Sequence, residues 1–200
     1  METIECINSR VSVHKFKKKA LSKSKLTKIL TAGMRAPSAG NSQPWRFIVL
    51  DDEATIDRIA KATLQPEVFY NVPYVVVVCA DTSKVASEFP KRGGLYAVQS
   101  VAAAIENMLL AATDAGIASI WIGAFADETV KAVLRIPQEI DVHAILPFGY
   151  SDGDTYRSAR IATAHVTFFN KWNNRANQKF FFPLSKQVAK IKKKLSRKKK

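Results

Sequence analysis

Cysteine and histidine, the side chains that most often hold metals or form catalytic pairs, are scarce in this chain. Its 200 residues include two cysteines, Cys6 and Cys79, and three histidines, His14, His143 and His165. The two cysteines lie far apart without a metal-ligand spacing, and two cysteines do not make the disulfide framework of a secreted domain. The histidines are scattered and form no Ser-His-Asp pattern. We therefore expect buried free thiols in a reducing compartment.

Long apolar runs and a leader segment are also missing. No run reaches the roughly 18 apolar residues of a transmembrane helix. The first five residues lack the basic and apolar regions of a signal peptide. The composition, 47% hydrophobic and 24% charged, suits one ordinary globular domain. These features predict a soluble, cytoplasmic protein.

Acidic residues are few, and the charge imbalance is uneven along the chain. The sequence has 31 Lys and Arg against 17 Asp and Glu, a formal charge of +14. Residues 186–200 carry nine of the basic residues and no acid, which leaves 22 basic against 17 acidic residues, or +5, elsewhere. A second basic cluster lies near the other end and consists of Lys15, Lys17, Lys18, Lys19, Lys23, Lys25 and Lys28.

The basic end follows an aromatic segment, so we predict a folded domain over residues 1–175 and an arm with a basic tail over 176–200. On a monomer, Phe180–Phe182 would be an exposed apolar patch, which suggests an arm that lies on a partner subunit. Beyond it, three apolar residues share one helical face among lysines: Val188, Ile191 and Leu195. This pattern is typical of a helix on an anionic membrane or of a tail that contacts nucleic acid, with a plain solvated tail as the alternative.

The spacing of apolar residues predicts alternating helices and strands. We expect helices near 2–8, 22–34, 95–115 and 127–134, and strands over 45–50, 74–80 and 142–148. In the first helix, Ile4 and Ile7 would face inward. The helix over 95–115 is apolar nearly all round, with a broad face formed by Val98, Val101, Ala102, Ile105, Met108, Leu109 and Ala112. Such a helix must be buried in the core or against a partner, which favours a dimer.

Two short segments are rich in residues that shape the backbone. The run Lys91-Arg92-Gly93-Gly94, just before a predicted helix, lacks the spacing of a phosphate-binding loop, so we predict a flexible turn there. The run 35–47, between a predicted helix and a predicted strand, holds a proline, a glycine and several amide and hydroxyl side chains. Pro37 disfavours helix before it, whereas Gly40 and Asn41 tolerate positive φ and let the backbone approach a bound group.

The order of residues in that run, Ala-Pro-Ser-Ala-Gly-Asn-Ser-Gln-Pro-Trp-Arg-Phe over 36–47, resembles the signature loop of the nitroreductase family. That family consists of FMN-dependent flavoenzymes that reduce nitroaromatics, quinones and related acceptors. The resemblance implies that Ser38 and Asn41 contact a flavin bound mainly by the partner subunit, with Pro37 shaping the loop. We call residues 35–47 the signature loop.

Two further segments extend the resemblance toward the amino terminus. Residues 9–16 resemble the Arg-Arg-Ser-x-Arg-x-Phe opening of the family, which assigns the FMN phosphate to Arg10 and Ser12, although Val11 and His14 replace the other two arginines. Family members also place a polar side chain near the flavin pyrimidine just before the second strand. Gln65 is the first candidate for this role, and Asn71 is the alternative.

The remaining matches lie in the second half of the chain. Residues 116–123 resemble a family segment that passes along the flavin ring, which implies that Ile122 and Gly123 lie at the cofactor and that the N–H of Gly123 or its neighbour faces the flavin N5. Family members also carry a basic residue about ten residues before an Asn-x-Trp near this end, and the resemblance to 170–172 implies that Arg160 is a second phosphate-binding arginine, with Arg157 as the substitute.

Together these matches imply an α+β, three-layer nitroreductase-like fold, with a central mixed sheet flanked by helices, in a domain-clasped homodimer. The implied activity is ping-pong electron transfer from NADH or NADPH through FMN to a nitroaromatic, quinone or related small acceptor. The missing catalytic side chains agree with this chemistry because a flavin performs the redox step itself. The alternative is a flavin-binding protein without significant turnover, whose basic tail binds nucleic acid or anionic membrane.

Overall fold

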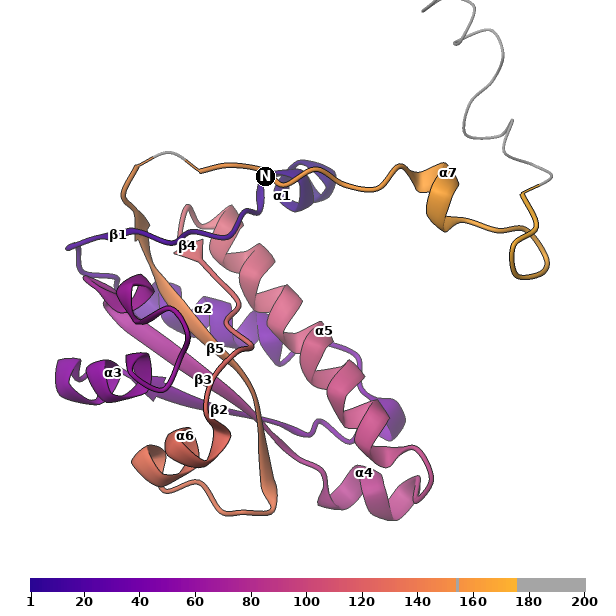
Figure 1. The fold of residues 1–200 in the computed structure, drawn as a ribbon, viewed down its shortest axis with the longest axis horizontal. Coiled ribbons are helices and arrows are strands. Elements are labelled where there is room, and N and C mark those ends of the chain that lie inside the picture. The colour runs from indigo at the N-terminus through magenta and orange to yellow at the C-terminus, as the bar shows by residue number, and fades with distance from the viewer. Residues whose placement is uncertain (154, 176–200) are drawn as a thin grey trace, which may run out of the picture. The chain divides into compact units, whose positions relative to one another are not determined.

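The computed structural model describes residues 1–153 and 155–175. The chain divides into two compact units, one from Met1 to Tyr156 and one that begins at Arg157. In the first unit, a β-sheet is covered by helices on both faces (Figure 1). In the second unit, the described helix is α7, Thr163–Val166. The predicted aromatic arm and basic tail lie outside the described residues.

The sheet is built around two long apolar strands. Its strands are β1 (Phe16–Lys17), β2 (Trp45–Leu50), β3 (Tyr74–Asp81), β4 (Ala118–Ser119) and β5 (Ile140–Ser151). They follow the order β1-β5-β3-β2, and β4 pairs with β5. The pairings between these strands are antiparallel, and a parallel bridge joins Ser12 to Ser119.

Side chains of β3 alternate between two hydrophobic clusters, because successive residues of a strand point to opposite faces. Val75 and Val77 pack on one face with Ile56, Ile59 and Val130. Val76, Val78 and Ala80 pack on the other face with residues of the long helix, including Ile105 and Met108. The strand is therefore buried on both sides, as its uninterrupted apolar sequence predicts.

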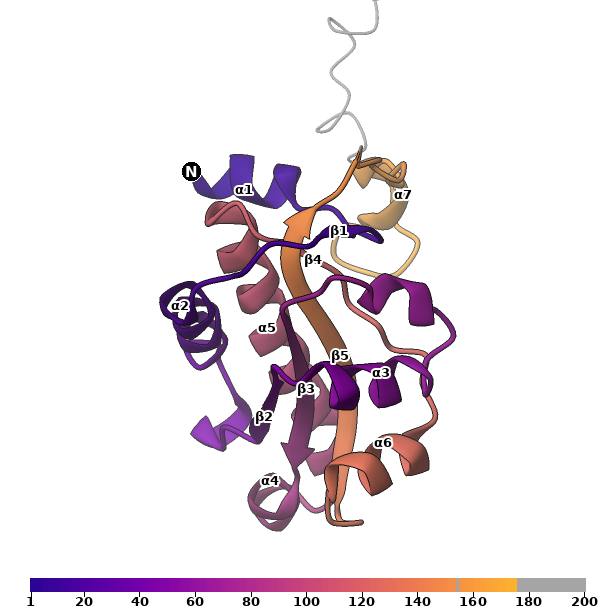
Figure 2. The same cartoon turned by 90° about the vertical axis from the view of Figure 1, so that its left-hand side faces the viewer.

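The helices cover these two faces as two outer layers. On one face lie α2 (Lys23–Gly33) and α5 (Gly93–Asp114), and on the other α3 (Glu53–Ala60) and α6 (Asp127–Leu134) (Figure 2). The shorter elements are α1 (Thr3–Ser9), η1 (Ala39–Asn41), η2 (Pro66–Phe69) and α4 (Ser83–Glu88). The predicted α+β, three-layer architecture is confirmed.

The long helix α5 has the length and hydropathy of a membrane span. It packs in the core, where Ala104, Ile105 and Met108 are fully buried. One detail of its predicted face is wrong: Val98 is exposed, as is Leu95, which lies outside that face near the start of the helix. The sheet covers only one side of α5, so this stripe of the helix stays uncovered in one subunit.

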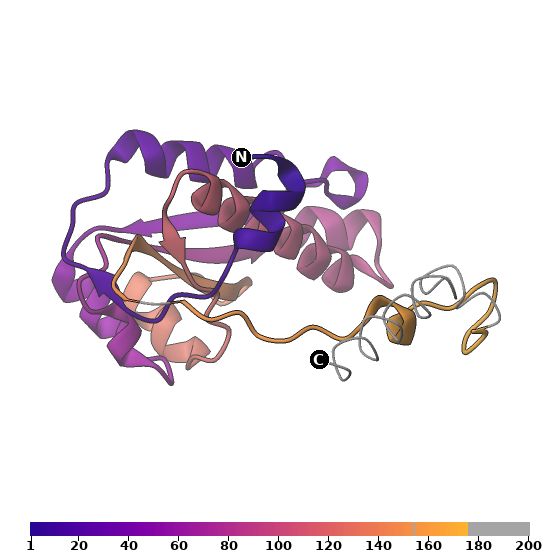
Figure 3. The ribbon, with the colours of Figure 1, turned by 90° about the horizontal axis from the view of Figure 1, so that it is seen from above.

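The prediction for the first helix is also wrong in its orientation. Ile4 and Ile7 of α1 are 69% and 48% exposed, whereas Cys6 is buried, and its thiol donates to the carbonyl of Leu110 at 3.3 Å. Seen from above, α1 lies beside α5, and the chain continues from it past β4 to β1 (Figure 3). The thiol-bearing face of α1, and not its isoleucine face, therefore meets α5.

Gly93, the first of the two adjacent glycines, lies where α4 and α5 pack closely together. Lys91 and Arg92 form the predicted turn, but α5 already begins at Gly93. A Cβ on Gly93 would lie 2.5 Å from the Cα of Ala86 and 2.8 Å from the carbonyl oxygen of Val85. Since these are backbone atoms of α4, we expect Gly93→Ala to lower the free energy of unfolding by about 1–3 kcal/mol in urea titrations.

Gly94→Ala is the matched control, because its added Cβ would meet nothing within 4 Å. Alanine is also the better helix former, so we expect a change of less than about 1 kcal/mol. Equal destabilisation by both substitutions would contradict close packing as the reason for Gly93.

Candidate flavin site

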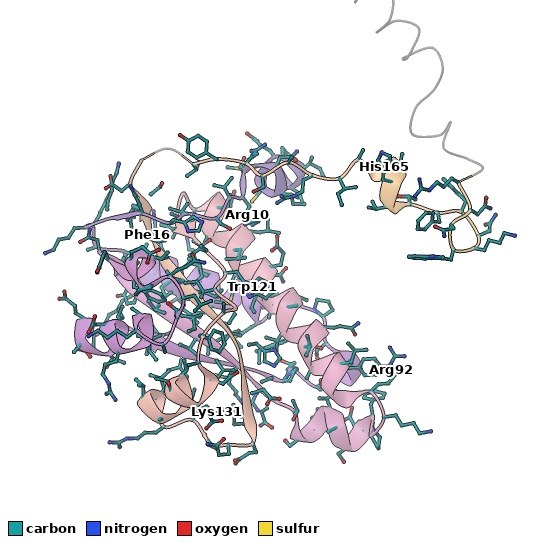
Figure 4. The ribbon with its side chains drawn as sticks, viewed as in Figure 1. Arg10, Phe16, Arg92, Trp121, Lys131 and His165 are labelled. Carbon is teal, nitrogen blue, oxygen red and sulfur yellow. The ribbon has the colours of Figure 1, made fainter. Side chains whose placement is uncertain are left out.

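The predicted phosphate residues lie beside the short strand β4. The backbone N–H of Val13 donates to the carbonyl of Ser119 at 3.1 Å, next to the Ser12–Ser119 bridge. The Ser12 side chain is exposed, and the Arg10 side chain is 20% exposed. Arg10 Nε lies 3.8 Å from Oε1 of Glu106 on α5, so a carboxylate holds the guanidinium at this place (Figure 4). This distance leaves the other guanidinium N–H groups for a ligand.

The chain that follows β4 is fixed to the centre of the sheet. Ile122 is buried, and its N–H and carbonyl exchange hydrogen bonds of 3.0 Å with the carbonyl and N–H of Ile145 in β5. The N–H of Ile122 is therefore already used. Within the described residues, the N–H groups of Gly123 and Ala124 both lack a hydrogen-bond partner, and Gly123 is the one without a side chain to keep a ligand from its backbone.

Gly123 is not required by packing within this chain. A Cβ built on it would meet only Nε1 of Trp121, at 3.9 Å, and its φ lies outside the left-handed region. The Trp121 side chain is 39% exposed, and Figure 4 shows it near the middle of the first unit. The open space over Gly123 is the place where a planar group could approach the backbone.

Gln65 follows two residues that pair with the chain just after Gly123. Leu64 N–H donates to the carbonyl of Ala124 at 3.4 Å, and Thr63 forms a bridge with Phe125. The alternative residue, Asn71, lies elsewhere, with its side-chain amide donating to the carbonyl of Phe16 at 3.4 Å. The geometry therefore brings Gln65, and not Asn71, beside the Gly123 turn.

The signature loop forms a compact network around three residues with positive φ. As predicted, Gly40 and Asn41 have φ of 55° and 52°, and Gln43 follows with 48°. The Gln43 N–H donates to Oγ of Ser38 at 3.1 Å, and its side-chain amide donates to Oδ1 of Asn41 at 3.0 Å. These bonds occupy acceptor atoms of the two side chains. The Ser38 hydroxyl proton and the Asn41 NH₂ group therefore remain as donors for a ligand.

Arg46 and Asp81 anchor the loop to the sheet. Arg46 donates to the carbonyl of Gln43 at 3.2 Å and to Oδ2 of Asp81 at 2.9 Å. Hydrogen bonds from the hydroxyl and N–H of Ser83, and then the Arg46 charge, lower the pKa of Asp81. Sequence reasoning missed this anchor because Asp81 lies 35 residues from Arg46 and carries no local signal.

The loop also contacts the first half of α5. Ala39 N–H lies 3.4 Å from Oγ of Ser100, and an open pocket of about 200 Å³ is lined by Pro37, Ser38, Ala39, Tyr96, Gln99, Ser100 and Ala103. Glu106, the partner of Arg10, follows Ser100 by six residues. On an α-helix that separation is about 9 Å along the axis and about 240° around it. The chain thus places Arg10 and the signature loop on different sides of α5.

Arg160 lies in the second unit, in the segment before α7, where its side chain is exposed and its Nη1 is 3.4 Å from the carbonyl of Ser158. Its predicted role beside Arg10 stays a prediction, as does the substitute role of Arg157.

Known proteins of the same family match this chain over most of its length. The family described as the nitroreductase family matches residues 7–67 and 63–150. A protein of Archaeoglobus fulgidus named "Putative NADH dehydrogenase/NAD(P)H nitroreductase" is 37% identical over 153 residues, which span 74% of this chain and 85% of that protein. The chain belongs to the nitroreductase family.

Solved structures agree with this assignment. A nitroreductase family protein from Clostridium novyi is 31% identical and has a TM-score of 0.70, covering 87% of this chain and 96% of that one. An FMN-dependent nitroreductase from Clostridium difficile is 26% identical, with a TM-score of 0.72 and coverages of 84% and 99%. The predicted family is therefore confirmed.

His143 lies apart from these residues and has a structural consequence. It is the extra residue of a β-bulge, because Ala144 and Val142 pair with the consecutive residues Val78 and Cys79. Its Nε2 is buried without a hydrogen-bond partner in the described part of the chain. Burial lowers the pKa of His143 below 6.5, and the charges of Asp141 and Asp127 only partly oppose this shift.

Stability should therefore fall on acidification. Below about pH 6.5 the unfolded chain binds a proton at His143 more readily than the folded chain does, so the contribution present above this pH is lost as pH falls through the folded-state pKa. We expect the urea midpoint of the wild type to drop between about pH 7.5 and about pH 5.5. His143→Gln should make this drop smaller, whereas the control His14→Gln, at an exposed position, should keep it. Identical pH dependence in all three proteins would contradict the assignment.

Proposed function

We propose that this protein is an FMN-dependent NAD(P)H oxidoreductase of the nitroreductase type. The observation that carries the proposal is a strip along residues 119–125. Arg10 and Ser12 lie at one end of this strip, the free N–H of Gly123 lies at its turn, and Gln65 lies at the other end. Ligands with a charged phosphate, a ring that accepts backbone donors and a polar heterocyclic edge suit this order of groups.

The residues present fit FMN in chemical terms. Arg10 carries a fixed planar charge suited to phosphate, and the Ser12 hydroxyl adds a donor. Gln65 offers both an amide donor and an acceptor for a pyrimidine edge. Gly123 leaves room for a ring to reach its N–H, which we propose faces the flavin N5. Bound FMN would supply hydride acceptance and delivery, which explains the lack of a catalytic side chain.

We propose that a homodimer completes each site. In one subunit, Arg10 and the signature loop contact α5 through Glu106 and Ser100, which face different sides of the helix. Pro37, Ser38 and Asn41 would therefore serve the flavin held by the other subunit. Exposed apolar residues on α5 and α1 support such an interface: Leu95 and Val98, and Ile4 and Ile7.

The two substrates would use the same open face in turn, in a ping-pong mechanism. NADH or NADPH would deliver a hydride and leave before a nitroaromatic, quinone or related acceptor enters. The name of the Archaeoglobus relative, which includes NAD(P)H nitroreductase, supports this choice of reductant. A cytoplasmic location belongs to the proposal and agrees with two free, buried cysteines.

Absorbance of the purified protein tests the proposed activity. We expect a yellow protein, or one that turns yellow when FMN is added, with absorbance that bleaches under anaerobic NADH or NADPH. Addition of a nitroaromatic or a quinone should then restore the colour. A colourless protein that does not take up FMN would overturn the function, and a bound flavin that neither nicotinamide reduces would favour a binding protein instead.

Flavin titration tests the individual residues. We expect Arg10→Ala and Arg160→Ala each to weaken FMN binding by about tenfold to a hundredfold, because charge-assisted hydrogen bonds contribute about 1.5–3 kcal/mol. Gly123→Ala should weaken binding by about tenfold or more, since a methyl group would crowd the ring while the chain itself has room for it.

Two controls separate flavin contacts from general charge and from folding. Arg58→Ala removes an exposed arginine on α3, and deletion of residues after Pro183 removes the basic tail, so both should keep FMN affinity within about twofold. Urea titration should show unchanged stability for Gly123→Ala. Loss of FMN on tail deletion, with Arg160→Ala unaffected, would place the second phosphate partner beyond residue 183.

A further inference from the structure

The flavin site leaves unexplained a strong charge asymmetry in the first quarter of the chain. Residues 6–50 contain ten Lys and Arg and no Asp or Glu. Of these ten, Arg10 and Arg46 have structural partners in Glu106 and Asp81. Seven of the other eight are lysines within residues 15–28, a segment that has no part in the proposed flavin contacts.

These lysines lie just before and on β1, on the connection to α2 and on the first half of α2. We call them the lysine surface: Lys15, Lys17, Lys18, Lys19, Lys23, Lys25 and Lys28. All are exposed except Lys25, which is half-buried, and none forms an ion pair among residues 1–153 and 155–175. Figure 3 shows β1 and α2 following one another along one side of the first unit.

Local geometry concentrates positive charge on this surface instead of dispersing it. Lys19 Nζ lies 4.2 Å and Lys25 Nζ 5.6 Å from the centre of the Tyr150 ring, so two ammonium groups share one aromatic side chain. The first turn of α2 carries Lys23 and Lys25 and no acid, although the amino end of a helix favours negative charge.

Nearby acidic groups do not balance this charge. Asp152, whose backbone N–H donates to the carbonyl of Lys15 at 2.9 Å, is at the same edge of the sheet, but its carboxylate has no ion pair in the described part of the chain. Because these seven lysines have no ion pair with a carboxylate in the described part of the chain, the surface keeps a strong excess of positive charge. An external polyanion would relieve the repulsion, whereas water and salt only screen it.

We propose that the lysine surface binds the anionic face of a lipid bilayer. Lysines act as flexible point charges, which suits a diffuse layer of lipid headgroups. Residues 14–28 contain no arginine, so the surface lacks the forked donors that suit bidentate contacts with individual phosphates. The basic sequence 186–200, with apolar residues at every third or fourth position, has the composition of segments that lie on anionic membranes.

This inference depends on charge placement and stands independently of the proposed oxidoreductase activity. The inference is tested by co-sedimentation of the full-length protein with vesicles of phosphatidylcholine alone or of phosphatidylcholine mixed with phosphatidylserine. We expect binding only to the mixed vesicles, and weaker binding at about 0.5 M salt than at about 0.1 M. Binding to both vesicle types alike would overturn the proposal.

The decisive variant is Lys17→Gln/Lys18→Gln/Lys19→Gln. Each lysine near an anionic surface strengthens partitioning by about fivefold, so this variant should bind the mixed vesicles about a hundredfold more weakly. The matched control, Lys61→Gln/Lys84→Gln/Lys91→Gln, removes the same charge from exposed positions elsewhere in the first unit and should bind within about threefold of wild type.

Three results would overturn the assignment. Undiminished binding of the Lys17–Lys19 variant would show that the basic tail alone carries the interaction. Equal loss in both variants would indicate dependence on net charge without a defined surface. Binding to a short duplex DNA with no binding to mixed vesicles would identify a nucleic-acid surface instead. Equal urea midpoints of the two variants and the wild type exclude misfolding as the cause of any loss.

Discussion

Burial of β3 and β5 on both faces is the constraint on which the rest of this structure depends. Six consecutive residues of β3, from Val75 to Ala80, are buried, and so are Ala144 to Leu146 of β5. A sheet that is apolar on both faces needs a layer of helices on each side. This need positions α5 on one face and α6 on the other, and it leaves the strand ends and connecting turns as the polar surface available to a ligand.

The candidate site is a direct product of that arrangement. The strip 119–125 runs beside β5 because Ile122 exchanges two backbone hydrogen bonds with Ile145, and this pairing turns the N–H of Gly123 away from the sheet. The N-terminal segment joins the same strip through Ser12 and Ser119. The signature loop instead leaves α2 on the other side of α5. The two groups of candidate flavin contacts therefore lie on different sides of α5, which is the physical basis for proposing that two subunits share each flavin.

Sequence patterns predicted the elements well wherever one residue type determined the local structure. The apolar run 74–80, for example, predicted β3. The patterns predicted less well which side of a helix is covered. Ile4, Ile7 and Val98 all lie exposed, because helical spacing shows that residues share a face without showing what lies opposite that face.

The site was predictable in its motifs but not in its supports. The resemblance singled out Arg10, Ser38 and Asn41, yet the residues that hold them come from distant parts of the chain. Glu106 lies beside Arg10 from the far half of α5, and Asp81 holds Arg46 from the end of β3. Such pairs depend on the tertiary fold, and a single sequence carries no periodicity or spacing that would reveal them.

The backbone of the signature loop shows why those supports matter. Residues other than glycine cost about 1–2 kcal/mol in the left-handed region, less for asparagine, and the loop contains Asn41 and Gln43 there in addition to Gly40. The bonds from Gln43 to Ser38 and Asn41, and from Arg46 to Gln43, each return about 0.5–1.5 kcal/mol and offset much of that cost. The loop is thus held in an unusual shape before any ligand arrives. A ligand that binds this loop conformation loses no affinity to ordering of the loop, because the loop is already ordered in the folded protein.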